Sequence, residues 1–291
     1  MSISGISVVI PCYNQGRTIG EALDSVHQQT VPAAEIVIID DGSEDIFTRQ
    51  ILTEIRGSGT YVVRTENSGV AAARNLGIRL TSSPYIVLLD GDDILEPEYF
   101  EHASKVLDDQ SAVDFVTCGL KAFEGADYTW IPPCTLLETL AKGGPHISSM
   151  FRRKIWHFVG GFDESLPGYE DMDFWISAMG QGSQGTVLDE PFLRYRVRSN
   201  SRYHNAISPE NYVPTMAAIY KKHWSRIEKY DQDLIREKEA FLEEQRQYQL
   251  YLTEKTGKLQ QELHAVNQEI ERTQEALYNK QDDIKGKILI S

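Results

Sequence analysis

Two stretches, EIVIIDDGSED at residues 35–45 and YIVLLDGDD at residues 85–93, decide the fold of this chain. Each begins with an apolar run rich in β-branched residues, which is typical of a strand buried on both faces of a parallel sheet. Each ends in aspartates around one glycine. Ligands of open α/β sheets bind beyond the carboxyl ends of the strands. The two clusters therefore predict one acidic site, built from segments 50 residues apart.

The neighbouring sequence extends this pattern into an alternation of strands and helices. Apolar runs at residues 6–10 and 115–118 predict two further strands. Helical spacing of apolar residues predicts helices over residues 18–29, 70–80 and 97–107. This order predicts an α/β fold with a mostly parallel sheet flanked by helices.

The composition limits the classes of protein to consider. The 291 residues include 29 basic and 43 acidic side chains, a net charge of −14, with 41% hydrophobic residues. Such a chain is folded rather than disordered. Its acidity gives no attraction to the nucleic-acid backbone, so we expect no nucleic-acid partner. Phosphate ligands are not excluded, because a few local groups or a metal ion can reverse the charge inside a cleft.

Cysteine usage and apolar runs bear on the compartment. Cys12, Cys118 and Cys134 include no CxxC pair, which argues against a zinc site or a disulfide framework and fits a reducing cytosol. The longest apolar runs are about five residues, so we expect neither a signal peptide nor a transmembrane segment. We predict a cytoplasmic location, and peripheral attachment at the inner face of a membrane stays open.

Turn-forming residues divide the chain. All eleven prolines, and all but two of the 21 glycines, lie at or before Pro214. This distribution predicts one domain over residues 1–224 and an extended helical tail over residues 225–291. The helical pattern runs to Ser291 without a stop signal, as in a chain truncated within a longer helix.

The tail has the apolar spacing of a coiled coil. Leu252, Leu259 and Val266 are spaced by seven, and polar residues fill most of the positions between them. A narrow apolar stripe on a polar helix favours self-association into a homo-oligomer, or docking to a partner enzyme. Folding back along the domain is the alternative.

The chemistry of the acidic site follows from its donors. Converging carboxylates repel unless a cation compensates them. Mg²⁺ or Mn²⁺ takes one or two carboxylates and completes its shell with phosphate oxygens and water, and Asp90 with Asp92 offers such a pair. Nucleotide diphosphates are the ligand class that this predicts.

The chain has no GxxxxGK[ST] and no GxGxxG after its first strand, which argues against P-loop and dinucleotide-binding proteins. For Ser43, Glu44 or Asp93 taken singly, capping of the following helix or turn is a better interpretation than ligand binding.

Four further stretches lie in a recognisable order: SVVIPCYNQGRTIGEALDSVHQQT at 7–30, ENSGVAAARNLGI at 66–78, ISSMFRRKIWHFVGGFDESLPGYEDMDFW at 147–175 and RYRVRSNS at 194–201. With the two acidic stretches, they resemble glycosyltransferase family 2, which comprises inverting enzymes with a GT-A fold. The resemblance covers residues 3–202. Any one motif is weak evidence, and their joint order is specific.

The resemblance implies roles at the donor end. Pro11 and Tyr13 match positions that contact the nucleotide base, and Asp41 matches the aspartate that accepts from N3–H of a uridine or thymidine base. A UDP- or dTDP-linked sugar is therefore the expected donor. Arg74 matches a basic residue near the base and phosphates, although a solvated helix face is its alternative. Asp90 matches the residue that contacts the ribose.

The same resemblance implies a divalent metal, Mn²⁺ or Mg²⁺. Asp92 matches the metal ligand of the Asp-x-Asp motif, with Asp90 beside it and Asp93 as a substitute or supporting group. Many members carry a histidine where this chain has Arg198. Arginine can neutralise a diphosphate but cannot ligate a metal. His204, six residues further on, is the candidate replacement.

Catalysis requires a base for the acceptor hydroxyl. Asp171 matches the family's base, and Glu170 matches the residue that holds or orients the acceptor. The alternative is that both simply decorate a helix N-terminus and complement its dipole. Trp156 and Trp175 are candidates for stacking on a sugar, with a core position favoured for Trp175.

Together these matches imply a metal-dependent, hexosyl-type glycosyltransferase. It would move a sugar from a nucleotide-diphosphate donor to a hydroxyl of a glycan or lipid-linked acceptor, in surface polysaccharide or glycoconjugate synthesis. The alternative from another class is a non-catalytic nucleotide-sugar-binding scaffold that assembles partners through its coiled coil. No motif identifies the sugar or the acceptor.

Overall fold

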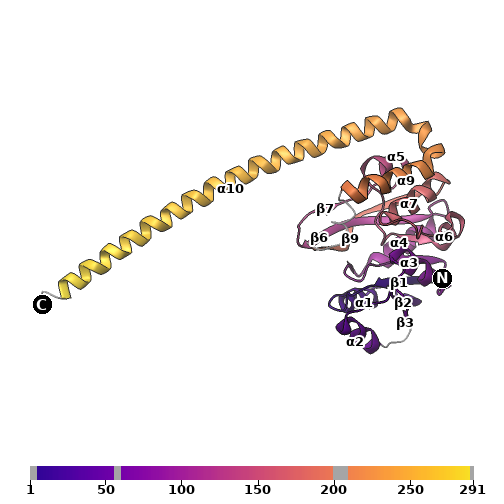
Figure 1. Cartoon of the computed structure of the whole chain (residues 1–291), viewed down its shortest axis with the longest axis horizontal. Coiled ribbons are helices and arrows are strands. Elements are labelled where there is room, and N and C mark those ends of the chain that lie inside the picture. The colour runs from indigo at the N-terminus through magenta and orange to yellow at the C-terminus, as the bar shows by residue number, and fades with distance from the viewer. Residues whose placement is uncertain (1–4, 56–59, 199–208, 289–291) are drawn as a thin grey trace. The chain divides into compact units, whose positions relative to one another are not determined.

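The computed structural model describes residues 5–55, 60–198 and 209–288 (Figure 1). The chain divides into two compact units, Met1–Glu237 and Lys238–Ser291. The strands of the first unit are β1 (Ile6–Cys12), β2 (Glu35–Asp40), β3 (Thr60–Arg64), β4 (Tyr85–Leu88), β5 (Ile94–Leu95), β6 (Phe115–Glu124), β7 (Thr129–Trp130), β8 (Met150–Arg152) and β9 (Gly185–Val197). Its helices before residue 200 are α1 (Ile19–His27), α2 (Ile46–Glu54), α3 (Val70–Arg79), α4 (Tyr99–Asp109), α5 (Leu136–Lys142), α6 (Arg153–Val159) and α7 (Glu170–Gly180).

Within the described residues, the strands form one sheet in the order β3-β2-β1-β4-β8-β6-β9-β5, with β7 paired to β6. The first four strands are parallel, as the sequence predicts. The other half is mixed: β8 runs antiparallel to both β4 and β6, whereas β6 and β9 are parallel. The predicted class, an α/β sheet flanked by helices, is confirmed. The parallel order places the carboxyl ends of β1, β2 and β4 at one edge.

Both faces of the parallel half are covered, which explains its continuous apolar runs. Side chains alternate between faces along a strand, so Val8 and Ile10 lie in one core and Val9 lies in the other. The helices α1 and α4 pack on the first face, and α3 and α7 on the second. Trp175 of α7 is fully buried in the second core. The core interpretation of Trp175 is therefore correct.

The C-terminal part is helical, as predicted. Its elements are α9 (Pro209–Ile227), the 3₁₀ turn η1 (Glu228–Tyr230) and α10 (Asp231–Ile288). Helix α9 packs on α7 through a small apolar cluster that includes Ile176, Met216 and Ile219 (Figure 1). Helix α10 is 58 residues long, so the long C-terminal helix is confirmed. None of the helices in the described ranges combines the length and the apolar character that a membrane span requires.

The close packing of α3 on β1 gives a test of the fold. A Cβ on Gly77 would lie 2.2 Å from Cγ1 of Val9. We expect Gly77→Ala to lower the free energy of unfolding by about 1–3 kcal/mol, because overpacking outweighs the gain in helix propensity. Gly20 of α1 is the matched control, since a Cβ there meets nothing within 4 Å. Gly20→Ala should stabilise slightly in urea denaturation; equal gains for both variants would contradict this packing.

Candidate active site

A cleft of about 820 Å³ lies at the carboxyl ends of the parallel strands. Its walls come from the ends of β1, β2 and β4, from α3, and from α7, β9 and α9. This one cleft is lined by most of the residues to which the sequence gives a role in the site: Pro11, Tyr13, Asp41, Arg74, Asp90, Asp92, Asp93, Glu170, Asp171 and Arg198. Trp156 and Trp175 are not among its described lining residues, and His204 lies outside the described residues. The expected assembly of distant acidic segments is thus present.

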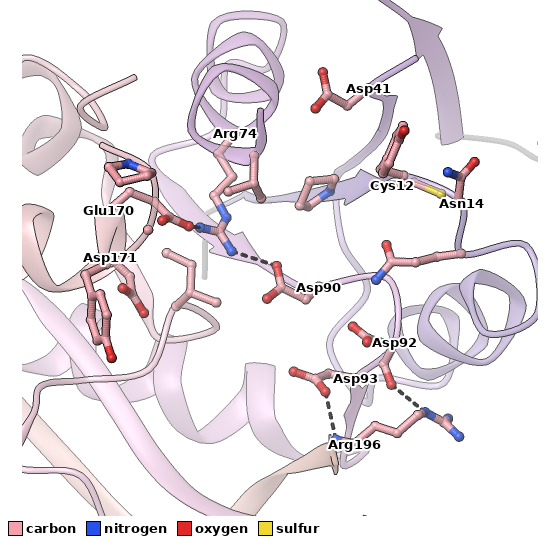
Figure 2. A pocket seen from close by; sticks show the side chains of 18 of the residues that line it. Cys12, Asn14, Asp41, Arg74, Asp90, Asp92, Asp93, Glu170, Asp171 and Arg196 are labelled. Carbon is pink, nitrogen blue, oxygen red and sulfur yellow. Dashed lines mark hydrogen bonds and ion pairs between the residues drawn. The ribbon is translucent and has the colours of Figure 1, made fainter. Parts of the chain in front are cut away.

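Asp41 holds the turn that leads into α3. Its Oδ1 accepts from the backbone N–H of Ser68 at 2.8 Å, and its Oδ2 accepts from that of Gly69 at 2.9 Å. The carboxylate is buried and lines the cleft (Figure 2). Each carboxylate oxygen can accept more than one hydrogen bond, so these contacts leave capacity for a donor group of a ligand.

The other polar groups that follow β2 are structural. Asp40 accepts from Arg64 at 2.6 Å and from the backbone N–H of Ser43 at 2.8 Å. The cap of α2 is Asp45, whose carboxylate accepts from two N–H groups of the first turn. Asn14, which the sequence did not single out, lines the cleft with a φ of 55° and bonds the backbone N–H groups of Glu44 and Asp45. Ser43 therefore takes part in the turn, and Asp45 caps the helix.

Arg74 is the central cation of the cleft. Its guanidinium donates from Nη1 to Oε1 of Glu170 and from Nη2 to Oδ1 of Asp90, each at 2.7 Å (Figure 2). The residue is 3% exposed, so the solvated-face alternative is wrong. Burial lowers the pKa of a guanidinium, but the charges of Asp90 and Glu170 outweigh it and raise the pKa of Arg74. Arg74 thereby joins the end of β4 to the start of α7.

The Asp-x-Asp segment is linked to β9. Asp92 Oδ2 accepts from Arg198 at 2.8 Å, and the buried Asp93 accepts from the backbone N–H of Arg196 at 2.9 Å. Burial, followed by the charge of Asp90, raises the pKa of Asp92. Burial and the charges of Asp90 and Asp92 raise the pKa of Asp93 more strongly. Asp93 thus holds β9 against the acidic turn, as a supporting group.

These carboxylates fit a metal bound jointly with a ligand. In the described part of the chain, no group of three His, Cys, Asp or Glu side chains could hold an ion. Asp90 and Asp92 supply two hard oxygen donors, which is the number Mg²⁺ takes when phosphates provide other ligands. Burial and then the charge of Asp90 raise the pKa of Asp92, although Arg198 acts in the opposite direction. A cation between these groups and a diphosphate would be stabilised there.

The opposite wall of the cleft is the start of α7. Tyr169 precedes the helix in the left-handed conformation, with φ 57° and ψ 23°, and Glu170 and Asp171 form its first turn. Burial, followed by the charge of Glu170, raises the pKa of Asp171 to about 6. The first-turn position agrees with the helix-dipole interpretation. Glu170 has in addition the buried partner Arg74, which that interpretation does not require.

Residues 7–162, more than half of the chain, match the family described as Glycosyl transferase family 2. The chain belongs to this family. It is 25% identical to Staphylococcus aureus TarS 1-349 crystallised with UDP-GlcNAc, with a TM-score of 0.63 over 74% of this chain and 65% of that one. This similarity confirms the predicted GT-A type fold.

Curated relatives are similar in sequence. The uncharacterized glycosyltransferase EpsJ of Bacillus subtilis is 27% identical over 67% of this chain and 62% of its own length. The chondroitin synthase of Pasteurella multocida is 29% identical over 59% of this chain and 18% of its own length. The chain thus spans less than two thirds of the length of these relatives.

The family match ends before α7, and side chains within it hold the glycine turn that precedes α7. Asn75 accepts from Nε1 of Trp156 and from the backbone N–H of Phe162, both at 2.9 Å. Gly160 and Gly161 have φ of 86° and 87°, which glycine adopts without strain. The indole of Trp156 is therefore a structural donor in this turn. The sequence signal for Asn75 was its place beside Arg74 in the AARN segment.

The buried ion pair gives a test of this geometry. Arg74→Met keeps an unbranched side chain but removes the guanidinium, which leaves Glu170, whose side chain is 7% exposed, without its cation. We expect a loss of about 3–5 kcal/mol in the free energy of unfolding. Arg74→Met combined with Glu170→Gln should recover part of the loss, because Glu170 is the more deeply buried of the two carboxylates that lose their cation and is then uncharged. Urea denaturation measures both, and a double variant no more stable than Arg74→Met would contradict the pairing.

Proposed function

We propose that this protein is an inverting glycosyltransferase that moves a hexosyl group from a UDP- or dTDP-linked sugar to a hydroxyl of a glycan or lipid-linked acceptor. One observation carries the proposal. Asp171, a carboxylate with a raised pKa, lines the same cleft as Asp41, Arg74 and the Asp90–Asp92 pair. The proposal is supported by this shared cleft, across which a base and a nucleotide diphosphate would face each other.

At the donor end, Asp41 would accept from the base, and Pro11 and Tyr13 would contact the base beside it. The UDP-GlcNAc complex of TarS supports a uridine donor for a fold of this type. Asp90 would contact the ribose, and Arg74 and Arg198 would lie near the phosphates. Both arginines are already paired with carboxylates of the cleft, so they are held in place before the donor arrives.

We propose that Asp92, with Asp90, holds Mn²⁺ or Mg²⁺. When bound, this ion would offset the negative charge that grows on the diphosphate as the sugar leaves. Arg198 donates to Asp92, so its guanidinium would lie close enough to offset part of the charge of the diphosphate. His204 remains a proposed addition to this site.

Asp171 would remove the proton of the acceptor hydroxyl as that oxygen attacks the anomeric carbon. A base works best when its pKa lies near the working pH, and burial beside Glu170 shifts Asp171 in that direction. Glu170 accepts from Arg74, so its contribution would be to hold the guanidinium and the start of α7 while orienting the acceptor. Transfer would be a single displacement, with inversion at the anomeric carbon.

We expect Asp171→Asn to lower the rate of transfer by about 100-fold or more, because an amide cannot accept the proton. The affinity for UDP in the presence of Mn²⁺ should stay unchanged, because Asp171 faces the acceptor. Transfer assays and calorimetry measure the two quantities. Asp127→Asn is the control, since the Asp127 side chain is 83% exposed. Full turnover by Asp171→Asn would contradict the assignment, and a wild type that binds UDP without turnover would favour the scaffold alternative.

The pH dependence should follow Asp171. The carboxylate is active when unprotonated, and its pKa is about 6. We therefore expect kcat/KM to be level above about pH 6 and to fall tenfold per pH unit below it. UDP affinity, measured over the same range, separates loss of binding from loss of the base. A rate that stays level well below pH 6, with UDP still bound, would contradict a base of this pKa.

We also propose that residues 225–291 form a tail distinct from the domain of residues 1–224, and that the tail self-associates as a coiled coil. Leu259, Leu263 and Val266 follow the alternating spacing of four and three that packs one helix on another. Their side chains are between 52% and 61% exposed in the single chain. Docking to a partner enzyme in surface polysaccharide synthesis, or at the inner face of a membrane, is the proposal that remains if the chain is monomeric.

Substitution along this stripe tests self-association in the full chain. We expect Leu259→Gln, Leu263→Gln and Val266→Gln, combined, to lower the mass measured by light scattering, because apolar burial holds the helices together. Lys258→Gln, which changes a side chain that is 69% exposed and lies off the stripe, should leave the mass unchanged. A monomeric wild type would contradict self-association.

A further inference from the structure

Helix α9 contributes to the cleft although it lies beyond residues 7–162, the part that matches the family. Asn211 and Thr215 of α9 line the same cleft as Asp171. They are four residues apart, so they lie on one face of the helix. Thr215 is 5% exposed. The first turns of α9 therefore form a polar wall on the side of the cleft that holds the candidate base.

A buried polar cluster fixes this wall to the catalytic helix. His223 of α9, fully buried, contacts Asp173 of α7 at 2.8 Å through Nε2. Arg226 donates to Nδ1 of His223 at 3.0 Å, so Nε2 carries the proton and donates to Asp173. Lys222 also contacts Asp173 at 2.8 Å. Because Asp173 and Asp171 share the first turn of α7, the wall of α9 and the base are held together.

An aromatic pair lies where the two helices begin. The ring of Tyr169 meets that of Tyr212 edge to face, with centroids 5.5 Å apart. Tyr169 lines the cleft and has a left-handed backbone, which costs a residue with a Cβ about 1–3 kcal/mol and is concentrated at functional sites. An aromatic ring offers an apolar face, which suits the C–H face of a sugar ring.

The charges around the cleft distinguish between kinds of acceptor. The three arginines that line it are Arg74, Arg196 and Arg198, and each pairs with carboxylates. Among the described lining residues, Tyr169 supplies an aromatic ring, α7 supplies carboxylates, and α9 supplies an amide and a hydroxyl, but none of these is a cation. An anionic group placed there would be repelled by the charge of Asp171, because Arg74, the described cation nearby, is already paired with Glu170 and Asp90.

We propose that Asn211 and Thr215 form the acceptor subsite, and that the acceptor presents an uncharged sugar or polyol there, with one hydroxyl directed to Asp171. The amide and the hydroxyl would bond neighbouring hydroxyl groups of the acceptor, and Tyr169 would contact its apolar face. This inference rests on the proposed transferase function.

The experiment uses the full chain and the nucleotide sugar, from a panel of UDP- and dTDP-sugars, that the wild type hydrolyses fastest. The acceptor probes are neutral p-nitrophenyl glycosides and the 6-phosphates of the same sugars. Asn211→Ala and Thr215→Val remove the polar groups. Thr215→Ser keeps the hydroxyl, and Val213→Ala changes a side chain on the same helix that is 60% exposed.

We expect Asn211→Ala and Thr215→Val each to raise KM for the glycoside about five- to tenfold, the effect of losing one hydrogen bond. UDP affinity and hydrolysis of the donor by water should stay within about twofold of the wild type, because neither uses the acceptor subsite. Thr215→Ser and Val213→Ala should behave as the wild type, which should also prefer the glycosides to the sugar phosphates.

Three results would overturn the inference while leaving the proposed function intact. These are unchanged glycoside KM in both variants, an equal loss of hydrolysis and transfer, or a wild type that hydrolyses its donor but transfers only to phosphorylated sugars or to no sugar. A wild type that neither binds UDP nor hydrolyses any donor would instead refute the proposed function.

Discussion

The cleft depends on one buried cation. Arg74 pairs with Asp90 at the end of β4 and with Glu170 at the start of α7, from which it is separated by 96 residues. Without the guanidinium, two carboxylates would approach each other in a region of low dielectric, where like charges repel strongly. With it, the edge of the parallel sheet and the helix that carries Asp171 are drawn to the two sides of one cleft.

This arrangement explains how the residues divide the work. Some of the carboxylates around the cleft bind other parts of the chain and so have a structural role: Asp41 holds the turn into α3, Asp93 holds β9, and Asp173 holds α9. Asp92 and Asp171 have raised pKa values because burial and neighbouring carboxylates disfavour their charged forms. A carboxylate with a raised pKa is stabilised by a nearby cation or by binding a proton. A metal-diphosphate site at Asp92 would provide the cation, and an acceptor hydroxyl at Asp171 would provide the proton.

The sequence predicts much of this because the signals are local. Apolar β-branched runs reveal β1, β2 and β4, and aspartates at their ends reveal the acidic edge. Strands β3 and β9 are not predicted, because most of their side chains are partly buried or exposed and no continuous apolar run marks them. The partner of Glu170 and the pairing of Asp173 with His223 also escape, because contacts between distant helices leave no trace in local spacing.

If a base on α7 faces a donor held at the sheet edge, the attacking oxygen displaces the nucleotide in a single step. The most direct test is the anomeric configuration of the sugar released when water serves as acceptor, followed by proton NMR before the anomers equilibrate. From UDP-α-N-acetylglucosamine, the donor type seen with TarS, we expect the β anomer to appear first. First appearance of the α anomer would contradict it.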